Sequence, residues 1–215
     1  MFFKKNIADS LFGVQLIFAF LFGGGQFLHT MKTGEEVPSI TWFVLWQVFL
    51  LLNLILAYQA HRNQPSRVTL QTLWSYIVWT LMISLDLFAL LTMTSVEWSS
   101  RDTLSMVAVS LGVVSTLLVA QRKDLSIRDP MVKGYLAVLF KGVPQLILAY
   151  EIMLWGGQGV ATLAIISGHA TIISRLGQLW FSIKEAGWDR NRIGSAISEI
   201  ANEGSWIIVT IVWLF

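Results

Sequence analysis

Seven apolar segments dominate this sequence and constrain its fold more than any other feature. Each is close to the roughly 20 residues that a helix needs to cross the hydrocarbon core of a bilayer. The segments cover residues 9–29, 40–60, 70–93, 103–120, 134–153, 159–182 and 194–215. Because the connections between them are short, no soluble domain fits among them. We therefore expect an all-α integral membrane protein with seven transmembrane helices.

Composition agrees with this expectation. Charged residues make up only 13% of the chain, whereas soluble domains carry about a quarter. The chain contains no cysteine, so disulfides and thiolate chemistry are excluded. A formal net charge of +2 gives no reason to expect a nucleic-acid partner. The expected partners are the lipid bilayer and a small polar solute, and the sequence does not indicate an oligomeric state.

The connections differ in charge from one side of the expected bundle to the other. The N-terminus and the second, fourth and sixth connections together hold eleven Lys and Arg residues, whereas the opposite side holds only Lys32 and Arg101. Basic residues accumulate on the cytoplasmic side of membrane proteins. We therefore predict a cytoplasmic N-terminus and an external C-terminus, in a plasma membrane (the inner membrane, if bacterial). The first segment lacks a signal-peptide cleavage site, so we expect it to remain as a helix.

Two stretches of the chain resemble each other. Gly23 and Gln26 in the first segment match Gly142 and Gln145 in the fifth, at a spacing of 119 residues. The chain of a three-helix unit begins on one side of the membrane and ends on the other. Two such units joined directly would be inverted relative to each other, and a single helix between them makes them parallel. We therefore predict a 3+1+3 arrangement about a pseudo-two-fold axis along the membrane normal. Its parts are a first triple-helix bundle (1–93), a linker helix with its flanking loops (94–130) and a second triple-helix bundle (131–215).

The Val143-Pro144-Gln145 step resembles the proline–glutamine signature of the PQ-loop superfamily. That superfamily includes the SWEET sugar transporters, the cystinosin-type exporters and the KDEL receptors. The expected arrangement of helices resembles that of the family over nearly the whole chain. The resemblance of the sequence motifs rests on about a dozen positions. This chain departs from the pattern in two ways. Gly25 stands where the family has a proline, and the expected orientation is that of the vitamin B3 precursor transporters rather than of SWEETs. The resemblance implies transport by alternating access, a substrate contact from Asn202, and a hinge at Pro144.

Polar residues deep in the apolar segments are the candidate site. A charge at the centre of a transmembrane helix costs about 2.5–3.5 kcal/mol on insertion scales, so such residues face a cavity or a partner. Lys141 lies one turn before Gln145, and Trp206 lies one turn after Asn202, where it could stack on a ring. We predict that the substrate-binding residues are Gln26, Trp79, Lys141, Gln145, His169, Asn202, Glu203 and Trp206.

Alternative interpretations remain open for several of these residues. Lys141 and Glu203 could form an internal ion pair that only joins helices, and His169 could bond a neighbouring helix. The groups able to carry a coupled proton are Glu199, Glu203 and His169. Gly24, Gly25 and Pro144 would act as hinges, although glycines also allow close helix packing.

The function we expect is transport of a small polar solute (a sugar, an amino acid or a nucleoside-like molecule) through a pocket at the midplane. Transport would be facilitative or coupled to protons. The alternative is a ligand-binding receptor or accessory subunit of the same fold that performs no net transport. Neither a phosphate-binding loop nor a metalloprotease motif is present. We therefore expect no enzyme activity, no catalytic residue, no metal and no cofactor.

Overall fold

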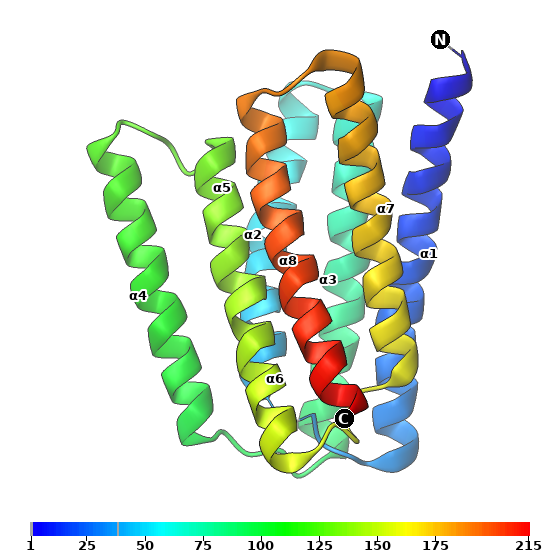
Figure 1. Cartoon of the computed structure of the whole chain (residues 1–215), viewed down its shortest axis with the longest axis vertical. Helices are drawn as coiled ribbons and strands as arrows, with labels where there is room; N and C mark the ends of the chain where they lie inside the picture. The colour runs from blue at the N-terminus through cyan, green and yellow to red at the C-terminus, as the bar shows by residue number, and fades with distance from the viewer. Residues whose placement is uncertain (1, 38) are drawn as a thin grey trace.

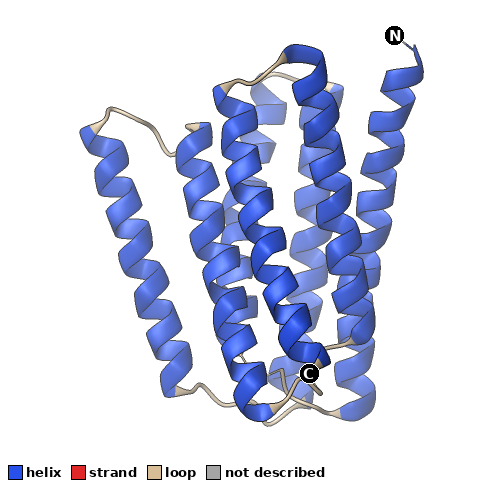
Figure 2. Cartoon of the chain, in the orientation of Figure 1, coloured by secondary structure: helices blue, strands red, loops and turns tan. Residues whose placement is uncertain are grey.

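The computed structural model describes residues 2–37 and 39–215, with residues 2–8 described by their backbone alone. Within these residues every regular element is a helix (Figure 2). The elements are α1 (Phe2–Thr33), α2 (Ile40–Asn63), α3 (Arg67–Met93), α4 (Ser100–Arg122), α5 (Pro130–Ala137), the π-helical turn η1 (Val138–Gly142), α6 (Val143–Trp155), α7 (Thr162–Ala186) and α8 (Arg190–Leu214). Because α5, η1 and α6 follow one another without a break, the described chain forms seven roughly parallel rods (Figure 1). The prediction of an all-α fold is confirmed.

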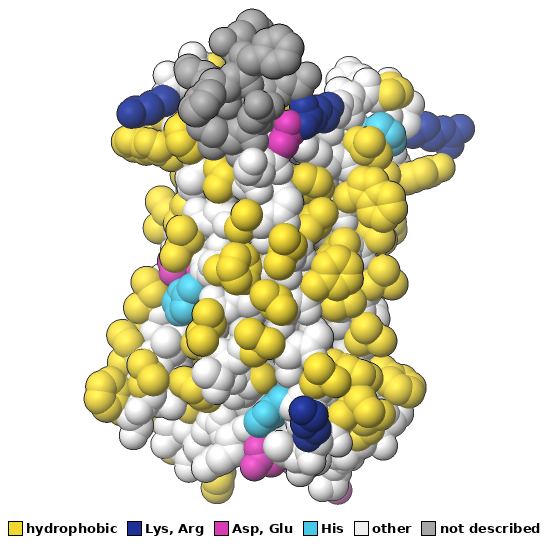
Figure 3. Space-filling model, turned by 90° about the vertical axis from the view of Figure 1, so that its right-hand side faces the viewer, with side chains coloured by type: hydrophobic (Ala, Val, Ile, Leu, Met, Phe, Trp, Pro, Cys, Tyr) yellow, Lys and Arg dark blue, Asp and Glu magenta, His cyan; other side chains and the backbone are white. Residues whose placement is uncertain are grey.

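Five helical rods are long and apolar enough to cross a membrane. They are Asp9–Thr33, Ile40–Asn63, Arg67–Met93, Ser100–Arg122 and Pro130–Trp155. Helices α7 and α8 are 25 residues each, which is also sufficient length, but they carry more polar side chains. On the long face drawn in Figure 3, apolar side chains cover the middle, and Lys and Arg side chains lie near the two ends. These features indicate a membrane protein.

Helix starts are fixed by side chains that accept the free backbone N–H groups of the first turn. Ser66 and Ser99 each form a capping box at the start of α3 and α4. Asp129 and Asp189 accept backbone N–H groups of α5 and α8. These caps explain why the helices begin three or four residues before the apolar segments that predict them.

The rods pack in a definite order. Helix α3 packs against both α1 and α2, and α8 packs against α5, α6 and α7. The two sets meet where α1 packs along α7 and where α2 contacts η1 and α6. Helix α4 stands at the edge of the bundle, beside α5 (Figure 1).

The connections lie at two ends of the bundle. The N-terminus and the loops 63–67, 122–130 and 186–190 lie at one end, which we call the N-terminal end (Figure 1). The loops 33–40, 93–100 and 155–162 and the C-terminus lie at the other, the C-terminal end. The end at which Arg128 and Arg190 lie is therefore the basic one. The side chains of Lys4 and Lys5, which contribute to the predicted orientation, lie outside the described part. The orientation in a membrane stays a prediction.

The predicted hinge positions differ in their local structure. Helix α1 runs unbroken through Gly23, Gly24 and Gly25. A Cβ at Gly23 would clash with Met82 of α3, and one at Gly25 would lie 2.9 Å from Leu163 of α7, whereas Gly24 faces open space. Two of the three glycines thus serve close helix packing.

Pro144 has a visible effect on its helix. Proline lacks an N–H group, and its ring clashes with the carbonyl group four residues before it. The preceding residues form η1, in which the Val143 N–H donates to Val138 O. Such π-turns occur within α-helices and are frequent at functional sites. The fifth rod therefore stays continuous but changes to π-helical geometry directly before Pro144.

Candidate functional site

A central cavity of about 30 Å³ lies between the two sets of helices. This volume has room for one or two water-sized molecules, so the site is nearly closed in this conformation. Its lining residues are Phe22, Trp46, Leu50, Tyr76, Trp79, Lys141, Gln145, Gly168, Thr171, Ile172, Arg175, Asn202 and Trp206. Five of the predicted substrate-binding residues are therefore brought together here: Trp79, Lys141, Gln145, Asn202 and Trp206.

The polar wall of the cavity is organised around Gln145. Its Nε2 donates to Asn202 Oδ1 at 3.1 Å, and its Oε1 accepts the Ser205 hydroxyl. Both ends of the Gln145 amide are thus held by α8, which also fixes the orientation of Asn202. Because the Asn202 Oδ1 is occupied by Gln145, the amide nitrogen is the group that Asn202 offers to the cavity.

Two cations reach the cavity, and they differ in their partners. Arg175 Nη1 lies 3.4 Å from Glu199 Oε1, and Gln15 can accept from Nε and Nη2 at 3.1 Å each when its amide faces them. Lys141 is 6% exposed, and its Nζ lies 5.0 Å from the centroid of the Phe49 ring. No described carboxylate lies within ion-pair distance of this ammonium group.

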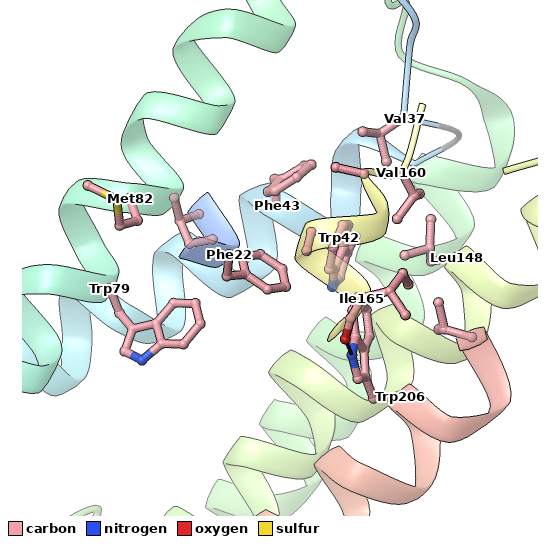
Figure 4. Packing of buried hydrophobic residues seen from close by; sticks show 14 of the residues in the cluster. Phe22, Val37, Trp42, Phe43, Trp79, Met82, Leu148, Val160, Ile165 and Trp206 are labelled. Carbon is pink, nitrogen blue, oxygen red and sulfur yellow. Dashed lines mark hydrogen bonds between the residues drawn. The ribbon is translucent and has the colours of Figure 1, made fainter. Parts of the chain in front are cut away.

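Aromatic and aliphatic side chains close the cavity toward the C-terminal end. Trp206 stacks on Trp42 with a centroid distance of 5.6 Å and an interplanar angle of 24°. Its Nε1 donates to Ile165 O at 3.3 Å (Figure 4). Beyond this stack, Val37 and Val160 are buried between the loops 33–40 and 155–162 (Figure 4). This end of the cavity is sealed. Trp42 lies in the first turn of α2, close to the end of that helix, but its side chain is buried.

Larger pockets lie beyond the cavity at both ends of the bundle. One of about 350 Å³ lies at the C-terminal end, where Val37 and Gly159 belong to its lining. Another, a vestibule of about 310 Å³, lies at the N-terminal end. Its polar lining consists of Asn53, Thr72, Tyr76, Arg128, Lys133, Asn191, Ser195, Ser198 and Glu199. Tyr76 lines both the vestibule and the central cavity. Two contacts also join a residue of the cavity lining to a residue of the vestibule lining: Lys141 with Phe49, and Arg175 with Glu199. Tyr76 and these two pairs therefore form one layer of side chains between the cavity and the vestibule. We call it the dividing layer.

An ion pair beside the vestibule ties α5 to α8. Asp129 accepts from Arg190 Nε at 2.9 Å and from Nη2 at 3.2 Å. Burial raises the pKa of the Asp129 carboxyl, but hydrogen bonds from Arg190 and the Met131 N–H outweigh it and leave the pKa below its usual value. Asp129 therefore stays ionised at neutral pH and compensates Arg190.

Three predicted substrate-binding residues, Gln26, His169 and Glu203, lie outside the lining of this cavity. Gln26 holds the loop before α7: its Nε2 donates to Gly159 O at 2.8 Å, and its Oε1 accepts the Ala161 N–H at 3.0 Å. It therefore holds the sealed end closed.

His169 and Glu203 pair with each other instead of lining the cavity. His169 Nδ1 lies 2.7 Å from Glu203 Oε1, and Nε2 lies 2.8 Å from Thr210 Oγ1. Ile166 lies one helical turn before His169, and Ile200 lies one turn before Glu203. Both isoleucines are exposed. The physical reason is helix geometry: Glu203 follows Asn202 directly, so their side chains point about 100° apart. The Lys141–Glu203 ion pair, which the sequence left open as an alternative, is not found among the described contacts, where Glu203 pairs with His169.

Sequence reasoning also missed residues of the site. Arg175, which is not among the predicted site residues, lines the cavity two turns from Gly168 on the same face. Tyr76 and Trp46 gave no signal, because aromatic residues are common throughout the chain. Glu199, predicted to titrate, is the partner of Arg175.

Comparison with known protein families, characterised proteins and solved structures finds no match to this chain. The PQ-loop resemblance therefore rests on the residues that carry it and stays a prediction.

Proposed function

We propose that this protein transports a small solute across a membrane by alternating access between two three-helix units, residues 1–93 and 131–215, with α4 as the linker. The order of packing supports this division. Helix α3 contacts both other helices of the first unit, and α8 does the same in the second. Equivalent third helices in the middle of each unit are the pattern expected of a parallel repeat.

The observation that carries the proposal is the position of the polar cavity. Both units contribute to its lining, the Trp42–Trp206 stack seals it at one end, and only the dividing layer separates it from the vestibule at the other. A site between two units that opens to one end at a time is what alternating access requires. The π-helical turn η1, before Pro144, supplies a place where the second unit can bend.

Proton coupling, if present, is best supported at Glu199. This carboxylate belongs to the dividing layer and pairs with Arg175, so a change in its charge would alter the barrier between vestibule and cavity. His169 and Glu203 are the second candidates, because their pair lies between α7 and α8, outside the cavity lining. Facilitative transport needs none of these groups.

The native absence of cysteine permits a direct test. In Asn202→Cys, the only thiol of the chain lines the cavity. Membrane vesicles of both orientations would be treated with a membrane-impermeant maleimide, with Ser198→Cys in the vestibule and Gln158→Cys at the C-terminal end as side markers. A transporter exposes the cavity thiol to both sides in turn, so we expect labelling of Asn202→Cys from each side. Ala19→Cys, which replaces a fully buried residue, should stay unlabelled.

The receptor alternative gives a different result. A receptor of this fold needs an opening at one end only, so Asn202→Cys would be labelled from the N-terminal side alone while both markers react as expected. That outcome would contradict the transport proposal.

A further inference from the structure

The route from the vestibule to the cavity is positively charged. Four basic residues line these two spaces: Arg128 and Lys133 in the vestibule, Arg175 and Lys141 at the cavity. The acidic residue that lines them, within the described chain, is Glu199. Clefts lined by one sign of charge concentrate ions of the opposite sign. This distribution favours an anion.

The charges at depth carry more weight than those near the mouth. The tendency of basic residues to gather on one side of a membrane accounts for Arg128 and Lys133, but not for a lysine at the middle of a rod. Glu199 compensates Arg175 at 3.4 Å. Lys141 is buried, with the face of the Phe49 ring as its described contact. Glu199 attracts Lys141 electrostatically from beyond ion-pair distance. A charge is costly inside a membrane unless it is paired, and no described carboxylate forms a direct ion pair with Lys141.

The hydrogen-bonding groups of the cavity also favour an anion. The Trp79 Nε1 group is buried without a partner. The oxygens of Gln145 and Asn202 each accept one protein hydrogen bond. The second N–H of Gln145 and the N–H groups of the Asn202 amide have no hydrogen bond among the described residues and can donate to a ligand. A cavity with surplus donors and an unpaired ammonium group is complementary to a carboxylate, which only accepts.

The remaining walls are aromatic. Trp46 and Trp79 lie with ring centroids 5.1 Å apart, and Phe22 lies 5.5 Å from Trp79. Together with Trp206 they surround the cavity with flat apolar surfaces. Such surfaces favour a flat apolar group over a hydroxyl-rich one.

We propose that the transported solute is an organic monocarboxylate with a small, flat apolar body. Its carboxylate pairs with Lys141 and accepts from Trp79 Nε1 and the Asn202 amide, while its apolar part lies among Trp46, Phe22 and Trp206. The solute reaches this position from the vestibule when the dividing layer opens. This inference rests on the proposed function. It narrows the transported solute from small polar molecules in general to carboxylate anions.

The test compares carboxylates with their uncharged amides on the purified full-length protein in detergent. Benzoate, phenylacetate and butyrate, each paired with its amide, would be titrated calorimetrically. A charge-assisted hydrogen bond that the amide cannot form corresponds to about tenfold to hundredfold in affinity. We therefore expect benzoate to bind about tenfold to hundredfold more tightly than benzamide, and butyrate to bind more weakly than benzoate.

Substitutions locate the effect. In Lys141→Met the affinity for benzoate should fall to that for benzamide, and Lys141→Arg should retain the preference for the anion. Lys184→Met is the matched control, because Lys184 also lies over an aromatic ring, 5.4 Å from the Trp180 centroid, but outside both linings; it should bind benzoate like the native chain. Should Lys141→Met fail to fold, Trp79→Phe, which keeps an aromatic ring and removes the N–H, should weaken benzoate more than benzamide, because the bond from an N–H to a carboxylate is stronger than the bond to an amide oxygen.

The outcomes separate this inference from the proposed function. If no carboxylate binds more tightly than its amide, or if Lys141→Met keeps the preference, the anion site is wrong, whereas labelling of Asn202→Cys from both sides would still support transport. If benzoate binds through Lys141 but Asn202→Cys reacts from one side only, the anion site stands and the protein is a receptor for it.

Discussion

Asp102 joins two helices through a single carboxylate. One oxygen accepts from the Ser99 backbone N–H at 2.9 Å and from its hydroxyl at 2.7 Å, which completes the cap of α4. The other oxygen accepts the Thr41 N–H at 3.0 Å, a free donor in the first turn of α2 that the N-cap residue Ser39 leaves unsatisfied. Helix α4 is thereby fixed to α2 at the C-terminal end.

Removal of the Asp102 carboxylate should remove a capping hydrogen bond from both α2 and α4. In Asp102→Ala we expect the free energy of unfolding to fall by about 2 kcal/mol, at about 1 kcal/mol for each lost cap. Thermal unfolding in detergent measures it as a lower Tm. Glu97→Ala removes an exposed acid at the same end and should leave the Tm unchanged. Equal Tm values for both variants would mean that the cap of α2 contributes nothing.

At the scale of the element, α1 contains adjacent glycines in different surroundings. A Cβ at Gly23 would lie 3.2 Å from Met82 Cα, which cannot move without shifting α3, whereas nothing lies within 4 Å of a Cβ at Gly24. The same substitution at neighbouring positions therefore separates helix packing from intrinsic helix preference.

Gly23→Ala should lower the Tm because α1 must move away from α3. Gly24→Ala should raise or keep it, since alanine favours a helix over glycine by up to about 1 kcal/mol. If Gly24 also acts as a hinge, Gly24→Ala slows uptake of solute into vesicles without loss of stability. A stable Gly23→Ala with native Tm would show that the α1–α3 contact is not as close as described.

At the scale of the whole molecule, the loop before α7 meets the loop before α2 backbone to backbone at the C-terminal end. The backbone of Gly159, in the loop before α7, lies against Glu36 and Val37 in the loop before α2, and a Cβ there would lie 2.8 Å from Val37 N and closer still to the Glu36 carbonyl group. Gln26 adds two hydrogen bonds across the same contact. The seal thus depends on a residue without a side chain.

Gly159→Ala should force the units apart at this end. Combined with Asn202→Cys, it should increase several-fold the rate at which the maleimide labels the cavity thiol from the C-terminal side. Gly13→Ala, where a Cβ meets nothing within 4 Å, provides the control in the same background. An unchanged labelling rate would show that the Gly159 contact does not limit opening.

Much of the helical framework is predictable from the sequence, because crossing a bilayer requires a long apolar run and the connections are short. The seven segments correspond to seven rods, which differ mainly at their capped ends. About half of the candidate site was predictable as well: Lys141, Gln145 and Asn202 are polar residues deep in apolar segments, and such residues face inward. His169 and Glu203 satisfy the same criterion and yet lie outside the cavity lining, where they pair with each other between α7 and α8.

The sequence by itself determined the class of protein, the extent of its helices and the weak point before Pro144, all of which follow from local composition and backbone chemistry. The tertiary structure alone decided which polar residues share the cavity, that Arg175 pairs with Glu199, and that no carboxylate in the described part of the chain lies within ion-pair distance of Lys141. A helix carries each side chain at an angle set by its position, and which angle faces the interior depends on the rotation of that helix against its neighbours. Contacts far apart in the chain fix this rotation, such as those of Gly23 with Met82 and of Gly159 with Glu36.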